Sequence, residues 1–198
     1  MNMSNHLRVS RGFTLIEVLI ALFILAVGIL GIIGLQLFAK QNNFDSVQRT
    51  AAATLATDIV ERMRMNKSAL ADYISTKEPV AAPAAIPTDC AASGTPCTPS
   101  ELAQHDLNTW YSLISGLSDK QGASNVGGLT EPSACIIQDP SGVGGVVGKT
   151  QYRIVIAWRG RTPLSNSTRS TCGNDATGAR YGAGDAYRRI FILDARIE

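Results

Sequence analysis

One carboxylate, Glu17, stands directly before the longest apolar segment of the chain. The eighteen residues from Val18 to Leu35 carry no polar side chain, and no charge occurs between Glu17 and Lys40. An ionised group at the start of such a segment is costly to desolvate and needs a partner of opposite charge. The alternative is that Glu17 lies among lipid headgroups, where the helix dipole favours an acidic residue.

Proteolytic cleavage just before the apolar segment would create a cation that could pair with Glu17. Gly12 separates a short basic leader, which contains Arg8 and Arg11, from the apolar residues that begin with Phe13. Cleavage after Gly12 would leave the α-amine of Phe13 as a cation four residues before Glu17. Within a bundle of such helices, one subunit's Glu17 could pair with a neighbour's amine, which would fix the axial register because a misplaced subunit would leave a charge unpaired.

Groups for catalysis or metal binding are sparse. The chain has two histidines, and only His105 lies outside the leader. Around it there is no Ser or Cys signature of nucleophilic catalysis, and no C-x-x-C pair typical of a zinc site occurs. We therefore expect neither an enzyme nor a cofactor.

Four cysteines allow three pairings, and the residues alone do not decide between them. We favour Cys90–Cys97, which closes a short ring, and Cys135–Cys172, which ties a long polar loop to a strand. Disulfides are typical of an oxidising compartment.

Length and charge narrow the class of protein. The chain has 198 residues, a formal charge of +2, 17% charged residues and 45% apolar residues. These values exclude a disordered chain, a basic nucleic-acid-binding protein and a polytopic membrane protein.

The apolar segment matches the roughly 20 residues that cross a bilayer as a helix, whereas a buried helix of a soluble protein seldom stays apolar on every face. The basic residues before it predict a cytoplasmic N-terminus and an exported remainder.

The helix is expected to continue to Asn66. A single apolar stripe supports this, and Asp58 and Arg62 are placed to pair four residues apart. The residues of the stripe are Phe44, Val47, Ala51, Leu55, Ile59 and Met63.

The rest of the chain predicts an α+β head. Residues 78–99 are rich in proline and alanine and form a loop, and Thr98 to Glu101 is a capping box that starts a second helix ending at Gly116 or soon after. That helix is expected to turn Leu102, Leu107, Trp110, Ile114 and Leu117 inward. Strands are predicted at Ala134–Gln138, Gln151–Trp158 and Tyr187–Ile197, and the second should place Tyr152, Ile154, Ile156 and Trp158 on one face.

Three further stretches have plain interpretations. The glycine-rich residues 141–148 lack the register of a phosphate-binding loop and are expected to form a hairpin loop. Residues 159–186 form a long polar connection, which in a compact domain is usually functional or mobile. Asn166-Ser167-Thr168 matches a glycosylation tripeptide, a pattern that is common by chance.

The segment RGFTLIEVLIAL, residues 11–22, resembles the class III signal and N-terminus of type IV pilins and pseudopilins. The resemblance implies a pilin-like α+β fold, in which a long N-terminal helix packs on a small antiparallel sheet. It also implies cleavage between Gly12 and Phe13 by prepilin peptidase, and N-methylation of Phe13. Removal of residues 1–12 would leave 16 basic and 16 acidic residues.

Within the family, Ala26–Gln36 and Ala53–Asn66 resemble minor pilins of the PilV type. Gly28, Gly31 and Gly34 are spaced to allow close helix approach, and the helix-breaking proline usual in major pilins is missing. This resemblance implies a leader at 1–12, a transmembrane and assembly helix at 13–38, an amphipathic continuation at 39–66 and a periplasmic head at 67–198.

The same resemblance implies a subunit that helps initiate pilus assembly in a tip complex. Its partners would be the inner membrane, the major pilin, other minor pilins and prepilin peptidase, with a tip adhesin as a further candidate and no nucleic acid. Two alternatives remain open, a pseudopilin of type II secretion and an adhesive module that binds through residues 159–186.

Overall fold

The structure is a computed structural model of the whole chain. It describes residues 12–80, 90, 96–117, 120–122, 124–125, 127–139, 151–165 and 169–197. The leader before Gly12, the glycine-rich residues 141–148, the tripeptide at 166–168 and most of the loop predicted at 78–99 therefore lie outside the described residues. The chain divides into two units, Met1–Asn42 and Asn43–Glu198.

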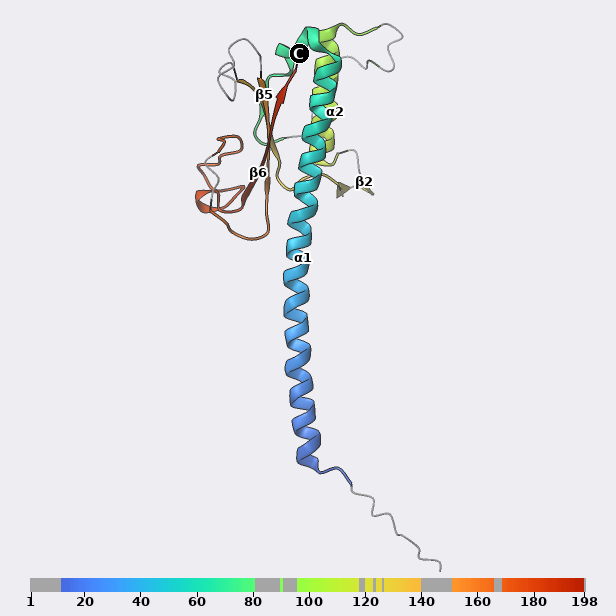
Figure 1. Cartoon of the computed structure of the whole chain (residues 1–198), viewed down its shortest axis with the longest axis vertical. Coiled ribbons are helices and arrows are strands. Elements are labelled where there is room, and N and C mark those ends of the chain that lie inside the picture. Colours follow the sequence, from blue (N-terminus) through green and yellow to red (C-terminus); the bar gives the residue numbers. More distant parts are fainter. Residues whose placement is uncertain are drawn as a thin grey trace, which may run out of the picture. The chain divides into compact units, whose positions relative to one another are not determined.

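Helix α1 covers Leu15–Met65 and contributes residues to both units (Figure 1). The part of α1 that lies in the first unit is exposed on every side. Among the described residues, α1 is the one helix that is long and apolar enough to cross a membrane. The expected helix from residue 13 to residue 66 is thus observed with its ends moved inward by one or two residues, as fraying ends allow.

In the second unit, a four-stranded antiparallel sheet has the order β1-β4-β5-β6. Its strands are β1 (Ser75–Lys77), β4 (Ser133–Asp139), β5 (Gln151–Arg159) and β6 (Arg188–Arg196). The three longer strands confirm the sequence prediction. Strand β1 and the short hairpin of β2 (Lys120–Gln121) and β3 (Ser124–Asn125) were not predicted, because strands of three residues or fewer carry no readable periodicity. The 3-10 helix η1 (Lys67–Tyr73) was not predicted either.

Helix α2 (Pro99–Ser115) begins with the predicted capping box and ends at Gly116 in the left-handed conformation. The Thr98 hydroxyl accepts from the Glu101 amide, and the Glu101 carboxylate accepts from the Thr98 amide at 2.8 Å. These bonds satisfy backbone donors that an isolated helix end leaves free, and they hold the pKa of Glu101 below its ordinary value.

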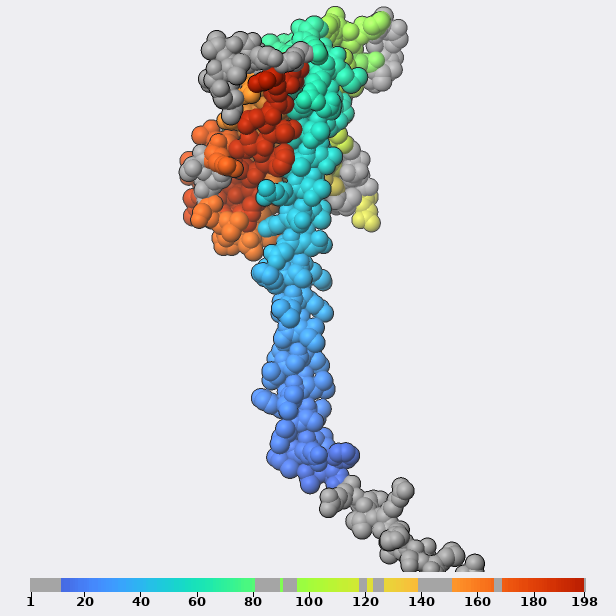
Figure 2. Space-filling model, viewed as in Figure 1, coloured from blue at the N-terminus to red at the C-terminus, as the bar shows by residue number. Residues whose placement is uncertain are grey.

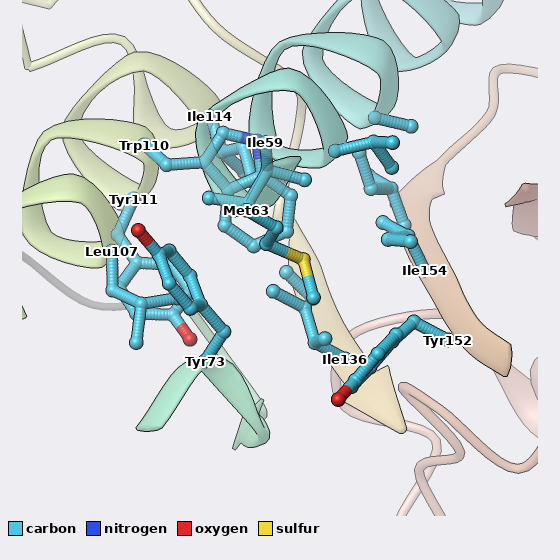
Figure 3. Close-up of a cluster of buried hydrophobic side chains, with 14 of the residues drawn as sticks. Ile59, Met63, Tyr73, Leu107, Trp110, Tyr111, Ile114, Ile136, Tyr152 and Ile154 are labelled. Carbon is cyan, nitrogen blue, oxygen red and sulfur yellow. The ribbon is translucent and has the colours of Figure 1, made fainter. Parts of the chain in front are cut away.

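The core of the head lies between the two helices and one face of the sheet. Figure 3 shows Met63 of α1, Trp110 of α2 and Ile154 of β5 drawn together in this cluster. Tyr152, Ile154, Ile156 and Trp158 are all buried in it, as their alternation along β5 predicts. The second helix buries Leu107, Trp110 and Ile114 as expected.

The predicted stripe of α1 is partly wrong. Ile59 and Met63 are buried, but Val47 is 57% exposed, and Ala51 and Leu55 are only partly buried. The buried face instead runs through Gln48, Ala52, Ala56, Ile59, Val60 and Met63. Ala52 and Ala56 at the centre of this face are fully buried, a feature that a search for large apolar residues overlooks. A similar shift on α2 buries Ala103, Asp106 and Tyr111, whereas Leu102 and Leu117 are half-buried.

The opposite face of the sheet carries a smaller cluster around the Cys135–Cys172 disulfide. It is covered by residues 169–187, whose described part is held in place by hydrogen bonds rather than by regular strands. The buried guanidinium of Arg188 donates to the carbonyls of Ser170 and Cys172, and the Asp175 carboxylate accepts from the Thr177 and Arg180 amides. Residues 169–187 of the long connection are thus an ordered cover over the disulfide.

Candidate assembly site

The first turn of α1 is built by Thr14 and Glu17. The Glu17 amide donates to the Thr14 hydroxyl at 3.3 Å and lies 3.1 Å from the Thr14 carbonyl oxygen. Thr14 therefore caps the helix, and Glu17 occupies the first turn, where the dipole favours a carboxylate. This role of Thr14 was not predicted, although the Thr-x-x-Glu spacing is the signature of such a cap.

The predicted cleavage position lies outside the helix. Gly12, Phe13 and Thr14 precede α1, and the Phe13 side chain is 83% exposed. A peptidase needs access to a non-helical backbone, so this position suits cleavage. Glu17 is also exposed and has no ion-pair partner among the described residues.

Beyond Glu17, every large apolar side chain up to Phe38 is at least 47% exposed. A Cβ added at Gly28, Gly31 or Gly34 would meet no atom within 4 Å. These glycines therefore serve no packing purpose within the described chain. A helix that is apolar all round and uncovered must be covered by lipid or by other helices.

Two family models match this part of the chain. One is described as a prokaryotic N-terminal methylation motif and matches residues 7–33, and the other is described as type IV pilin Tt1218 and matches residues 34–108. The two matches adjoin and together span about half of the chain. The chain belongs to the type IV pilin family. No curated protein and no solved structure matches it.

The family assignment agrees with the observed fold, an apolar N-terminal helix followed by a small antiparallel sheet packed on helices. Pilins are structural proteins rather than enzymes. His105, considered above as a catalytic candidate, is half-buried on α2, and its Nδ1 atom has no hydrogen-bond partner among the described residues.

The cysteines lie in the head, away from the first turn of α1 in sequence. The structure contains the disulfides Cys90–Cys97 and Cys135–Cys172, with Cα atoms 5.6 and 6.1 Å apart. Glu78 approaches the second disulfide, and its carboxylate accepts from the Gly173 amide at 2.7 Å. Both sulfurs are already bonded to one another, so this cluster offers no thiolate to a metal.

Proposed function

We propose that the chain is a minor pilin of the PilV type, processed by prepilin peptidase and assembled through Glu17. The observation that carries the proposal is the methylation motif at residues 7–33. It coincides with an exposed apolar segment that starts at a Thr14 cap and at Glu17, which has no ion-pair partner among the described residues. In this proposal residues 1–12 are the leader and 13–38 span the inner membrane, with the N-terminus in the cytoplasm. Residues 39–66 continue the helix, and 67–198 form the periplasmic head.

The proposed assembly step pairs two charges in a place of low dielectric constant. After cleavage, the Phe13 amine of one subunit meets the Glu17 carboxylate of its neighbour, while the apolar side chains of Val18–Leu35 pack against other helices. A subunit shifted along the axis would bury one charge without a partner, at a cost of several kcal/mol. The pair therefore selects one axial register, and the N-methyl group on Phe13 leaves the amine basic.

The minor-pilin role is supported by Gly28, Gly31 and Gly34, which leave room for a neighbouring helix, and by the lack of proline between Phe13 and Glu78. A subunit of this kind would help start the fibre and remain at its tip with other minor pilins. From there it would become extracellular together with the pilus.

Replacement of Glu17 by valine tests the assembly step. We expect Glu17→Val to be processed and inserted in the membrane, but to be missing from pili sheared off the cells. Glu61→Val is the matched control, since Glu61 is another exposed glutamate of the same helix, and it should enter pili normally. Normal amounts of the Glu17→Val protein in sheared pili would overturn the proposal.

The alternative assignment is a type II secretion pseudopilin, because the methylation motif is shared by both systems. Deletion of the gene separates the two. We expect loss of piliation and twitching with normal secretion of exoproteins. The reverse result would assign the chain to secretion. The adhesive alternative is tested by shortening residues 159–186, which should then abolish surface binding and spare piliation.

A further inference from the structure

The C-terminal part of the head is strongly basic. Between residues 151 and 197 there are eight arginines and only three carboxylates, Asp175, Asp185 and Asp194. The whole chain carries a charge of only +2, so this concentration is offset elsewhere. The net charge of the chain therefore does not reveal it.

Some of these arginines lie in strand β6, which is an edge strand of the sheet. Strand β6 has β5 on one side and no described strand on the other (Figure 1). The Gly160 amide donates to the Tyr187 carbonyl at 2.8 Å, just before β6 begins. Because hydrogen-bonded and non-hydrogen-bonded pairs alternate in an antiparallel ladder, the backbone groups of Ile190, Ile192 and Asp194 point away from β5.

These outward backbone groups have no partner among the described residues. In the described part of the loop before β6, the Leu164 amide donates to the Ala186 carbonyl at 2.7 Å, two residues before the strand begins. The N–H and C=O groups of Ile190, Ile192 and Asp194 thus form three successive, evenly spaced positions at which another strand can pair. In Figure 2 the red β6 reaches the surface beside the head portion of α1.

A groove of about 340 Å³ lies along the first half of this edge. Its lining combines the half-buried side chains of Ile190 and Ile192 with arginines, and it contains no carboxylate. Arg49 is exposed and makes no hydrogen bond or ion pair among the described residues, and the buried Nη1 atom of Arg189 has no hydrogen-bond partner there. The other Nη atom of Arg189 is engaged, since it lies 3.7 Å from the Asp45 carboxylate and donates to the Thr162 carbonyl. Of these two arginines it is therefore Arg49 whose guanidinium is free to take up a carboxylate or another anion.

We propose that the free edge of β6 is a docking site for an extended, acidic segment of another protein. The segment adds a strand to the sheet through Ile190, Ile192 and Asp194, and its carboxylates lie against Arg49. Backbone pairing gives affinity in this mode, and side chains give specificity. The groove is partly apolar and lies beside evenly spaced backbone groups, and both features suit a peptide. A nucleic acid would instead bind mainly through contacts between its phosphates and cationic side chains. The proposal does not depend on whether the chain serves a pilus or a secretion system.

The probe for this site is a synthetic peptide as long as β6, with alternating glutamate and valine, blocked ends and a fluorophore. Fluorescence polarisation measures its binding to the full mature chain in detergent micelles. We expect binding that weakens as ionic strength rises. The same peptide with N-methyl groups on alternate amides, and a lysine–valine peptide, should both fail to bind.

Variants of the chain test the two parts of the site separately. Ile192→Pro removes one outward N–H, which an edge strand tolerates, and should abolish binding, whereas Ile192→Thr keeps the N–H and should retain it. Arg49→Gln should weaken binding on the order of fivefold, the effect of about 1 kcal/mol. Arg64→Gln is the matched control, because Arg64 is an exposed arginine of the same helix that pairs with Glu61, and it should bind like the unaltered chain.

Two results would overturn the proposal. If the N-methylated peptide or a single-stranded DNA of equal charge bound as tightly as the acidic peptide, the arginines would form only a general anion-binding surface. If no peptide bound and Arg49→Gln instead caused the chain to aggregate, the arginines would serve to protect the edge from other strands.

Discussion

The hydroxyl of Tyr73 donates a hydrogen bond of 2.6 Å to the buried Asp106 carboxylate. The other carboxylate oxygen accepts from Arg62 at 3.0 Å, and Arg62 also pairs with Asp58. The Asn66 side chain adds bonds to the Tyr73 hydroxyl and to the Pro99 carbonyl. This cluster joins the end of α1, η1 and the start of α2. Its buried members Tyr73, Asn66 and Asp106 depend on one another because they lie in a region of low dielectric constant.

Replacement of Tyr73 by phenylalanine should therefore destabilise the head by about 1–3 kcal/mol, since it leaves one Asp106 oxygen buried without its donor. Denaturant unfolding of the mature chain in micelles, followed by the fluorescence of the buried Trp110, measures this effect. Tyr111→Phe is the control, because its hydroxyl donates to the neutral Ser75 hydroxyl. A loss for Tyr73→Phe no larger than for Tyr111→Phe would contradict the role of the carboxylate.

Stability of the head should fall at high pH. Burial raises the pKa of Tyr73, Tyr111, Tyr152 and Tyr181 above the ordinary tyrosine value. The hydrogen bond from Tyr73 to Asp106 raises that pKa further. A pKa that is raised on folding gives stability that is complete below the unfolded pKa of about 10 and is lost as the pH rises past it.

The measurement is the midpoint of urea unfolding between about pH 8 and pH 11. We expect a constant midpoint up to about pH 9.5 and a decline above it, and a shallower decline for Tyr73→Phe. A midpoint that stays flat through this range would show that these hydroxyls ionise as easily in the folded head as in the unfolded chain.

The end of α2 depends on Gly116, whose φ of +71° suits glycine alone. A Cβ there would also collide with the carbonyl of Gly127. Gly116→Ala should cost well over 1 kcal/mol of unfolding free energy. Gly122→Ala is the matched control, because Gly122 has a similar φ of +64° but open space around its Cβ, and it should cost about 1 kcal/mol. Equal losses would show that the contact with Gly127 is unimportant.

Much of the fold follows from patterns that one element carries by itself. The apolar run predicts α1, Thr98 and Glu101 predict the start of α2, and alternation predicts the core face of β5. What the sequence did not predict depends on partners distant in the chain. Gln48 is an example, since this polar residue of α1 is buried because its amide bonds the Gly128 carbonyl and the Thr130 amide.

The candidate site divides in the same way. Gly12, Phe13 and Glu17 could be chosen from the sequence, because their chemistry lies within six consecutive residues. The docking site at the edge of β6 could not be predicted from the sequence. It depends on Arg49 of α1 lying beside a strand that comes more than a hundred residues later in the chain. The pairing of Glu17 with a neighbour's amine involves a second subunit and stays a prediction.

The mass of this protein in sheared pili, measured on the intact chain, shows whether the chain is processed and assembled as proposed. We expect a chain that begins at Phe13, carries one methyl group on its α-amine, and has all four cysteines oxidised. A chain that still contains residues 1–12, or whose amine is acylated and therefore uncharged, would contradict it, because Glu17 would then have no cation to meet in the assembled fibre.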